Sequence, residues 1–242
     1  MTPSRFAWEI RRLASIDSTN RYLLDEARAG ASEGLVAVAD HQTAGRGRRG
    51  RTWEAPPGAS LLCSVLLRPQ LPPERLQLVA MAAAIAMAAA VERTAGFRPA
   101  LKWPNDLVVG DRKLAGLLAE ADGEAVVVGI GVNVEWHDFP DDLAATATAC
   151  NLEAGRTIDR RALLVAFLDV FESRYANLDT VVDEYRSRLA TLGRRVRVER
   201  PDGDLVGRAV DVGAAGELVL DVDARGGPVS VHAGDVVHLR DA

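Results

Sequence analysis

The chain has 242 residues, of which 48% are hydrophobic, and it carries a formal net charge of −5 at pH 7. This length is sufficient for one large domain or for a medium domain followed by a small one, and the apolar content is sufficient for a packed core. The acidic balance argues against a general nucleic-acid binder, but it is compatible with a local anion-binding site.

Neither the cysteines nor the apolar segments indicate secretion or a membrane. Cys63 and Cys150 lie far apart and form no C-x-x-C pattern, so we expect buried free thiols in a reducing compartment. The N-terminal sequence lacks the continuous apolar region of a signal peptide. The most apolar run, residues 76–91, is rich in alanine and short for a membrane span, so it predicts a buried helix. We therefore expect a cytoplasmic protein that does not associate with membranes.

The first part of the chain alternates between predicted helices and strands. A helix is predicted at 16–31, where Asp17 or Ser18 can cap its start and apolar residues fall on one face. Apolar runs at 35–40 and 60–69 predict two strands, and the alanine-rich helix follows two prolines.

Three strand-like segments follow in close order, at 100–109, 112–121 and 125–136. The connections "VGDR" and "ADGE" have the composition of turns. Because a parallel crossover needs a dozen or more residues, these strands are predicted to form an antiparallel meander.

The remainder predicts two helices and a change of architecture. Residues 137–155 are loop-rich, apolar residues recur at helical spacing over 163–175, and a further helix is predicted at 180–193. From there the chain consists of short alternating segments separated by glycine, which predict a small β-barrel. The expected fold class is thus α+β, with a large domain over residues 1–192 and a small β-barrel over residues 193–242.

The segment "HQTAGRGRRGRTWEAPPG", residues 41–58, concentrates four arginines in six positions. "GRGRRG" formally matches the G-x-G-x-x-G dinucleotide motif, but that motif requires a helix directly after it. Pro56 and Pro57 cannot open such a helix at the right place, so this interpretation is excluded. No G-x-x-x-x-G-K-[ST] sequence occurs, which excludes a P-loop as well.

Three interpretations of this arginine loop remain. Nucleic-acid-binding RGG segments usually occur in long disordered repeats, whereas this one is single. A solvated surface loop is the plain alternative. As an anion site, the glycines would let backbone N–H groups approach a ligand, and arginine forks match carboxylate and phosphate. Several forks suit a reaction in which a carboxylate attacks a phosphate. We expect the empty loop to be mobile, because unpaired like charges repel.

Five motifs in order resemble the biotin protein ligase family: "STN" at 18–20, "GRGRRGR" and the tryptophan after it at 45–53, "KWPND" at 102–106, "KLAGLLAE" at 113–120 and "GIGVNV" at 129–134. The resemblance implies a catalytic domain with a mixed sheet and flanking helices, related to class II aminoacyl-tRNA synthetases. It also implies that a small Src-homology-like β-barrel follows.

The activity implied by this resemblance has two steps. Biotin and ATP are joined into biotinyl-5′-AMP with Mg²⁺, and biotin is then transferred to one lysine of a carrier domain, such as that of acetyl-CoA carboxylase. Many relatives also carry an N-terminal DNA-binding domain. Only 17 residues precede Ser18, so the monofunctional form without DNA binding is expected, as a monomer or weak homodimer.

The resemblance also assigns the biotin site. The ureido group needs hydrogen-bond donors and acceptors, and the anionic carboxylate needs cations. The biotin-binding residues implied are Ser18, Thr19, Asn20, Gln42, Arg46, Gly47, Arg48, Lys113 and Gly116. The alternative for Ser-Thr-Asn is a simple helix cap. Lys113, Arg46 and Arg48 are the predicted catalytic residues, with Lys113 stabilising the charge on the α-phosphate.

ATP and the adenylate are assigned to Arg48, Arg51, Trp53, Lys102, Asn105, Asp106 and Asn133. Trp53 is a candidate stacking partner for adenine, or alternatively a buried anchor of the loop. Trp103 is expected in the core, with Pro104 holding it extended. No protein metal site has a recognisable spacing, so Mg²⁺ is expected to arrive with ATP, near Asp106.

Two alternative functions remain open at this point. One is a lipoate or octanoate protein ligase of the same fold. The other is a biotin-binding module without catalysis, against which the intact Lys113 and the arginine loop argue.

Overall fold

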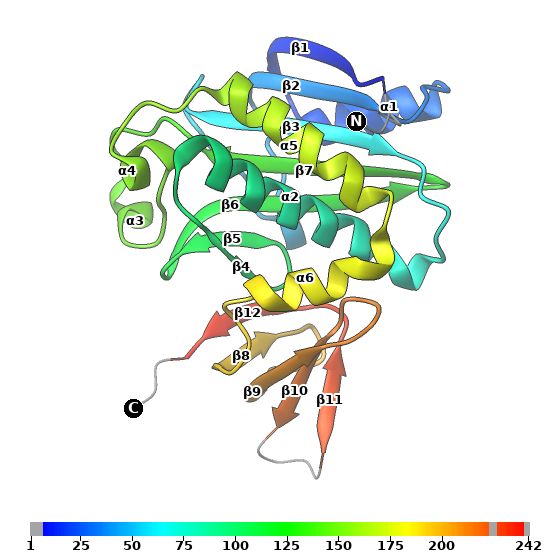
Figure 1. Ribbon diagram of the computed structural model, residues 1–242, viewed down its shortest axis with the longest axis vertical. Coiled ribbons are helices and arrows are strands. Elements are labelled where there is room, and N and C mark those ends of the chain that lie inside the picture. The colour runs from blue at the N-terminus through cyan, green and yellow to red at the C-terminus, as the bar shows by residue number, and fades with distance from the viewer. Residues whose placement is uncertain (1–6, 223–226, 240–242) are drawn as a thin grey trace.

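The computed structural model describes residues 7–222 and 227–239 as two sheets, the larger one covered by helices (Figure 1). The larger sheet has seven strands in the order β1-β2-β3-β7-β6-β5-β4. Its strands are β1 (Glu9–Ile16), β2 (Leu35–Gln42), β3 (Ser60–Leu67), β4 (Ala100–Lys102), β5 (Asp106–Val109), β6 (Arg112–Asp122) and β7 (Ala125–Asn133). The pair β1–β2 is parallel and all other pairs are antiparallel, so the expected mixed sheet is confirmed.

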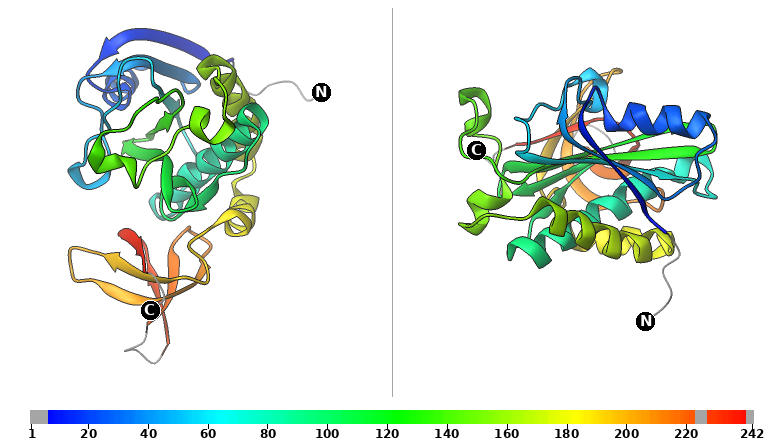
Figure 2. Two further views of the ribbon diagram at one scale, coloured as in Figure 1. Left: turned by 90° about the vertical axis from the view of Figure 1, so that its left-hand side faces the viewer. Right: turned by 90° about the horizontal axis from the view of Figure 1, so that it is seen from above.

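Helices cover both faces of this sheet (Figure 2). The helices of the described residues are α1 (Thr19–Arg28), α2 (Gln77–Ala95), α3 (Asp141–Ala144), α4 (Cys150–Ala154), α5 (Arg160–Tyr175) and α6 (Val181–Arg188), with single 3₁₀ turns at Arg48–Gly50, Pro73–Arg75 and Leu178–Thr180. Helix α1 packs on β2, β3 and β7 from one side, and α2 and α5 pack on each other on the opposite side.

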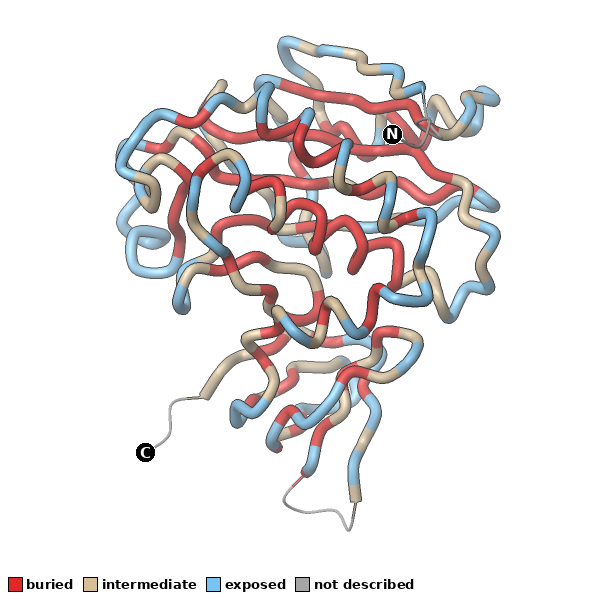
Figure 3. Tube along the Cα trace, in the orientation of Figure 1, coloured by how far each residue is buried: buried red, intermediate tan, exposed pale blue. Residues whose placement is uncertain are grey.

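Helix α2 is the centre of the core, as its composition predicts (Figure 3). Residues Pro73–Ala95 are long and apolar enough to cross a membrane, yet 78% of their most apolar stretch is buried inside the protein. Both cysteines are buried and free, as expected. Burial raises the pKa of the Cys63 thiol to about 12, and of the Cys150 thiol to about 12, so both are inert hydrophobic groups.

The predicted meander is confirmed by the antiparallel pairs from β4 to β7. One difference is that the segment 100–109 contains two strands, because the chain reverses at Trp103–Asn105 and Pro104 has no N–H for a ladder. The helix predicted to reach residue 193 ends at Arg188. Leu189 is extended there and bridges to Leu101, so packing against the sheet edge overrides the helical pattern.

Strand β1 was not predicted. It is an edge strand with arginines at positions 11 and 12 and, among the described residues, a single neighbouring strand, so half-exposed side chains obscure its alternation. Its parallel pairing with β2 depends on the intervening helix α1, whose start is correctly predicted.

The second sheet contains five antiparallel strands in the order β11-β10-β9-β8-β12. They are β8 (Arg195–Glu199), β9 (Leu205–Val212), β10 (Leu218–Val222), β11 (Pro228–Val231) and β12 (Asp235–His238). Trp103 is 1% exposed, as expected for a core residue, and links this sheet to the larger one. Its indole Nε1 donates to the carbonyl of Gly216 at 2.9 Å, and its backbone N–H donates to Thr191 Oγ1 at 3.2 Å.

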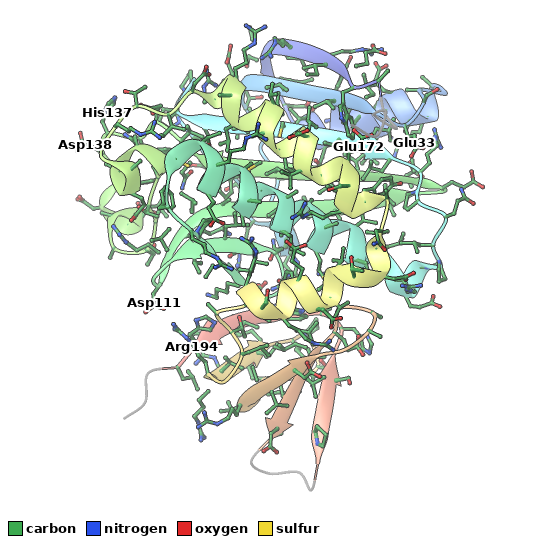
Figure 4. The ribbon with its side chains drawn as sticks, viewed as in Figure 1. Glu33, Asp111, His137, Asp138, Glu172 and Arg194 are labelled. Carbon is green, nitrogen blue, oxygen red and sulfur yellow. The ribbon has the colours of Figure 1, made fainter. Side chains whose placement is uncertain are left out.

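His238 lies at the junction of the two sheets. Its Nε2 is 3.2 Å from Thr191 Oγ1, and its Nδ1 is 3.2 Å from the guanidinium of Arg194. Arg194 in turn pairs with Asp111, and Figure 4 shows these two residues close together across the junction. Burial, with Lys102 and Arg194 nearby, lowers the pKa of His238 to about 4, whereas Asp111 opposes the shift.

This shift predicts how His238 affects stability. The folded state binds fewer protons than the unfolded state, whose histidine pKa is 6.5. The contribution of the neutral ring to the free energy of unfolding is therefore complete above pH 6.5, and it is lost as the pH falls to about 4. The free energy of unfolding in urea should fall less between pH 7 and pH 4 for His238→Gln than for wild type. Parallel curves for the two proteins would contradict this.

Candidate active site

One cavity brings together the predicted site residues from four separate segments, which are the start of α1, the arginine loop, the "KWPND" turn and strand β6. Strand β7 and the start of β12 complete its lining. The predicted residues that line it are Ser18, Thr19, Asn20, Gln42, Arg46, Gly47, Arg48, Arg51, Trp53, Lys102, Asn105, Asp106, Lys113 and Gly116. Asn133 is buried outside this lining, and its amide donates to the Thr148 carbonyl at 3.0 Å.

The start of α1 supplies buried polar groups. Ser18 is extended and its hydroxyl accepts from the Arg21 N–H, so it is indeed the N-cap. Thr19 donates to Gln42 Oε1 twice, from its backbone N at 2.8 Å and from its hydroxyl at 3.0 Å. The carbonyl of Gln42 is thereby occupied, which fixes the orientation of its amide. The residues that cap the start of α1 therefore also line the cavity.

The floor of the cavity depends on facing glycines. Gly116 on β6 pairs with Gly131 on β7, and the ring of Trp53 lies against both. A Cβ at Gly131 would lie 2.5 Å from Trp53 Cε2, and one at Gly116 would lie 3.0 Å from Cζ3. Trp53 Nε1 is buried with no hydrogen-bond partner among the described residues. Gly131 was not predicted as a site residue, although it stands in the "GIGVNV" motif.

Every arginine of the loop has a carboxylate partner. Arg46 pairs with Glu120 at 2.9 Å, and Arg51 pairs with Asp235 at 2.7 Å. The same Asp235 lies 3.4 Å from Arg48 and 3.6 Å from Arg49. The expectation of unpaired, mutually repelling charges was therefore wrong: the loop meets acidic groups of β6 and β12. No α-helix directly follows the glycines, which agrees with the exclusion of a dinucleotide-binding motif.

Asp235 lines the cavity but was not predicted as a site residue. It belongs to the second sheet, and the turn that carries it also offers the Gly234 carbonyl to Arg48 at 3.1 Å. Nothing in the local sequence marks this turn, because its partners lie about 185 residues away in the chain. Burial lowers the pKa of Arg48, against the attraction of Asp235 and Asp106, but an arginine remains charged.

The "KWPND" turn places charges around one carboxylate. Lys113 Nζ lies 2.7 Å from Asp106 Oδ1 and 5.7 Å from the centre of the Trp53 ring. Asn105 is held by its amide, which donates to the Leu117 carbonyl at 2.6 Å. Lys102 is half-buried; burial lowers its pKa and Asp106 opposes this.

This donor set fits an anionic ligand better than a resident metal. In residues 7–222 and 227–239 no group of three or more metal-ligating side chains is present. Asp106 can supply one carboxylate to a Mg²⁺ ion, which takes its remaining ligands from water and phosphate. The cations Lys102, Lys113 and Arg48 can hold polyphosphate oxygens around it.

Comparisons with known proteins identify the family of this chain. Residues 13–135 match the biotin/lipoate A/B protein ligase family, and residues 191–239 match the biotin protein ligase C terminal domain. The chain is 42% identical over 240 residues to a biotin–[acetyl-CoA-carboxylase] ligase of Mycobacterium tuberculosis, covering 94% of this chain and 88% of that protein. It is 32% identical to the bifunctional ligase/repressor BirA of Escherichia coli, covering 95% of this chain and 74% of that protein.

A solved structure shows the same fold. The biotin protein ligase from Aquifex aeolicus in complex with biotin and ATP superposes with a TM-score of 0.85 at 26% identity, covering 96% of this chain and 99% of that one. Family match, identity and fold thus agree over nearly the whole chain. The chain belongs to the biotin protein ligase family.

Proposed function

We propose that this chain forms biotinyl-5′-AMP from biotin and ATP and transfers the biotin to a specific lysine of a carrier domain of acetyl-CoA carboxylase or a related carboxylase. The observation that carries this proposal is a single cavity in which polar groups of α1, the cations of the arginine loop and Lys113 converge. Such a cavity can hold a polar ring system, a carboxylate and a phosphate at once.

Biotin would occupy the end of the cavity near α1. Ser18, Thr19, Asn20 and Gln42 supply donors and acceptors for the ureido group, and Gly116 allows close approach. Arg46, Gly47 and Arg48 would bind the carboxylate, with Lys113 between carboxylate and α-phosphate. Glu120 and Asp235, which pair with the arginines, would share these cations with the ligand.

ATP would occupy the end near the second sheet. Lys102, Asn105 and Asp106, which line this end, would bind the phosphates and Mg²⁺, and Arg48 and Arg51 would bind the adenylate phosphate. Trp53 already lies on the glycine floor and would stack on adenine. Asn133 would act on adenine only indirectly, since it does not line the cavity and its amide donates to the Thr148 carbonyl.

The reaction needs no covalent bond to the protein. A carboxylate oxygen of biotin attacks the α-phosphorus of ATP, the bond from this phosphorus to the bridging oxygen breaks, and pyrophosphate leaves. The neutral amine of the carrier lysine then attacks the acyl carbon, AMP leaves, and the amine proton is released to solvent. Lys113 and the arginines stabilise the charge on the phosphate in both steps, and Mg²⁺ adds further positive charge when bound.

The role of the glycine floor gives one prediction. In Gly131→Ala the new Cβ, 2.5 Å from Trp53, forces the ring off the sheet. Aromatic stacking on a base contributes about 1–3 kcal/mol, so the KM for ATP should rise by about tenfold. Gly227→Ala, whose Cβ meets nothing within 4 Å, is the matched control. An unchanged KM in Gly131→Ala would remove Trp53 from the nucleotide site.

We also propose the finer architecture. Residues 1–192 would form the catalytic domain, related to class II aminoacyl-tRNA synthetases, and residues 193–242 a Src-homology-like β-barrel. A boundary near 192 is supported by the end of α6 at Arg188 and by strands β8 to β12, which pair with one another among the described residues.

The proposed setting is cytoplasmic, as a monomer or weak homodimer that binds neither DNA nor membranes. The net charge of −5 and the pairing of the loop arginines with carboxylates leave little basic surface on the loop for DNA.

Transfer to a carrier domain tests the second half of the proposal. Purified chain, ATP, Mg²⁺ and labelled biotin should label an apo-carrier domain and leave the same domain with its acceptor lysine replaced by arginine unlabelled. A lipoate or octanoate ligase would label the carrier of its own acyl group instead. A biotin-binding module would label neither carrier.

A further inference from the structure

A continuous row of polar side chains runs along the cavity wall from Gln42 to Arg46. Thr19 donates to Gln42 at 3.0 Å, and Ser64 Oγ lies 2.7 Å from both Thr19 Oγ1 and Asn20 Oδ1. Asn20 then donates to Glu120 at 2.8 Å, and Glu120 pairs with Arg46 at 2.9 Å. Of the links in this row, Ser64 has no role in the mechanism above, and Glu120 enters it only as the ion-pair partner of Arg46.

Ser64 is unusual for its position. It lies within β3, whose eight residues are all buried, and it is itself 0% exposed. Burying a hydroxyl costs free energy unless the group is hydrogen-bonded. The hydrogen bonds of Ser64 therefore explain why a serine is tolerated in this strand. Across the sheet it pairs with Gly129, where a Cβ would collide with the Asn20 amide. Ser64 and Gly129 together therefore fix the position of the Asn20 side chain.

The hydrogen atoms of this row can be counted. The amide nitrogen of Asn20 faces two acceptors, the Leu118 carbonyl at 3.1 Å and Glu120, so its oxygen must face Ser64. Gln42 also presents an oxygen, because it accepts from the Thr19 backbone N–H. Three oxygen–oxygen contacts thus share the hydroxyl protons of only Thr19 and Ser64. The row has one acceptor more than it has protons, which suits a ligand that brings N–H groups.

Glu120 closes the row at the other end. Its side chain is 20% exposed, and one oxygen accepts from Asn20 while the other pairs with the half-exposed Arg46. A carboxylate between these partners fixes the direction of the guanidinium, which would otherwise be free in solvent.

We propose that Ser64 and Glu120 are positioning residues that connect the two ends of the biotin site. Ser64 sets the direction of the Thr19 hydroxyl and the Asn20 amide toward the ureido ring, and Glu120 aims Arg46 at the carboxylate. The inference rests on the proposed function and adds two residues to it that touch biotin only through others.

The test measures biotin binding by calorimetry without ATP, together with the KM for ATP in pyrophosphate exchange. Ser64→Ala should raise the Kd for biotin by about tenfold, because Asn20 Oδ1 loses its donor. Glu120→Gln keeps an acceptor for Asn20 but removes the negative charge that pairs with Arg46. It should raise the Kd for biotin by about fivefold. The KM for ATP should stay unchanged in both. The double variant should deviate from the product of the two effects, because the residues share one row.

Two controls separate positioning from general destabilisation. Ser60→Ala removes an equally buried hydroxyl of β3 that contacts Trp136 and Asn133 instead of the row. Asp122→Asn alters the next carboxylate on the same face of β6, which pairs with Arg28. Both should bind biotin as wild type does, whatever their melting temperatures.

The outcomes are distinguishable. If the wild-type chain binds no biotin, the proposed function fails and this inference with it. If wild type binds and adenylates biotin while Ser64→Ala and Glu120→Gln match it, only the inference is overturned. An equal rise in the KM for ATP and the Kd for biotin would also overturn it, since that marks a general structural defect.

Discussion

Lys113→Ala should lower the rate of biotinyl-AMP formation by about 10²–10³-fold while biotin binding remains measurable. In the structure Lys113 Nζ is 2.7 Å from Asp106 and lies over Trp53, so one ammonium faces both halves of the cavity. Its removal leaves the biotin carboxylate and the α-phosphate to repel each other without a cation between them. The polar groups of α1 are unaffected, so the ureido ring still binds.

Arg112→Ala is the matched control for this variant. Arg112 is the preceding residue on β6, it is exposed, and it pairs with Glu153 outside the cavity. Single-turnover formation of biotinyl-AMP with each variant distinguishes the two positions. Adenylation at the wild-type rate in Lys113→Ala would contradict the charge-bridging role.

Arg48→Gly should release biotinyl-AMP into solution. Arg48 ties the loop to the Gly234 carbonyl, to Asp235 and to Asn105, and it lines the cavity. A hydrogen bond to a charged group contributes about 1.5–3 kcal/mol, so the intermediate should dissociate at least about tenfold faster. The escaping adenylate acylates lysines at random, and labelled biotin should appear on a bystander protein such as serum albumin.

Arg49→Gly provides the comparison. Arg49 also faces Asp235, but at 3.6 Å, it is exposed, and it does not line the cavity. Its φ of 54° is tolerated by glycine, so the loop backbone is preserved. Arg49→Gly should keep the bystander unlabelled. Equal retention of biotinyl-AMP by Arg48→Gly and wild type would remove Arg48 from the adenylate site.

The local structure was largely predictable because it depends on neighbouring residues. The cap at Ser18, the apolar strands and the turns of the meander are encoded within a few positions. The elements that differ are those decided by distant contacts. Strand β1 exists through its pairing with β2, and α6 stops early because Leu189 joins Leu101.

The same distinction between neighbouring residues and distant contacts applies to the candidate site. Most of its predicted residues carry charge, amide or hydroxyl groups, all of them stand in distinctive motifs, and all but Asn133 line one cavity. Asp235, Ser64 and Gly131 were missed because their importance arises only in three dimensions. A serine inside an apolar strand and an aspartate after a glycine are ordinary in sequence, and their partners come from elsewhere in the chain.

Activation of biotin by ATP in this cavity can be measured as biotin-dependent exchange of labelled pyrophosphate into ATP, with lipoate as the control substrate. We expect exchange with biotin and none with lipoate. Exchange with lipoate alone would assign the chain to lipoate chemistry, and biotin binding without any exchange would contradict the claim that Lys113 and the arginine loop activate the ligand.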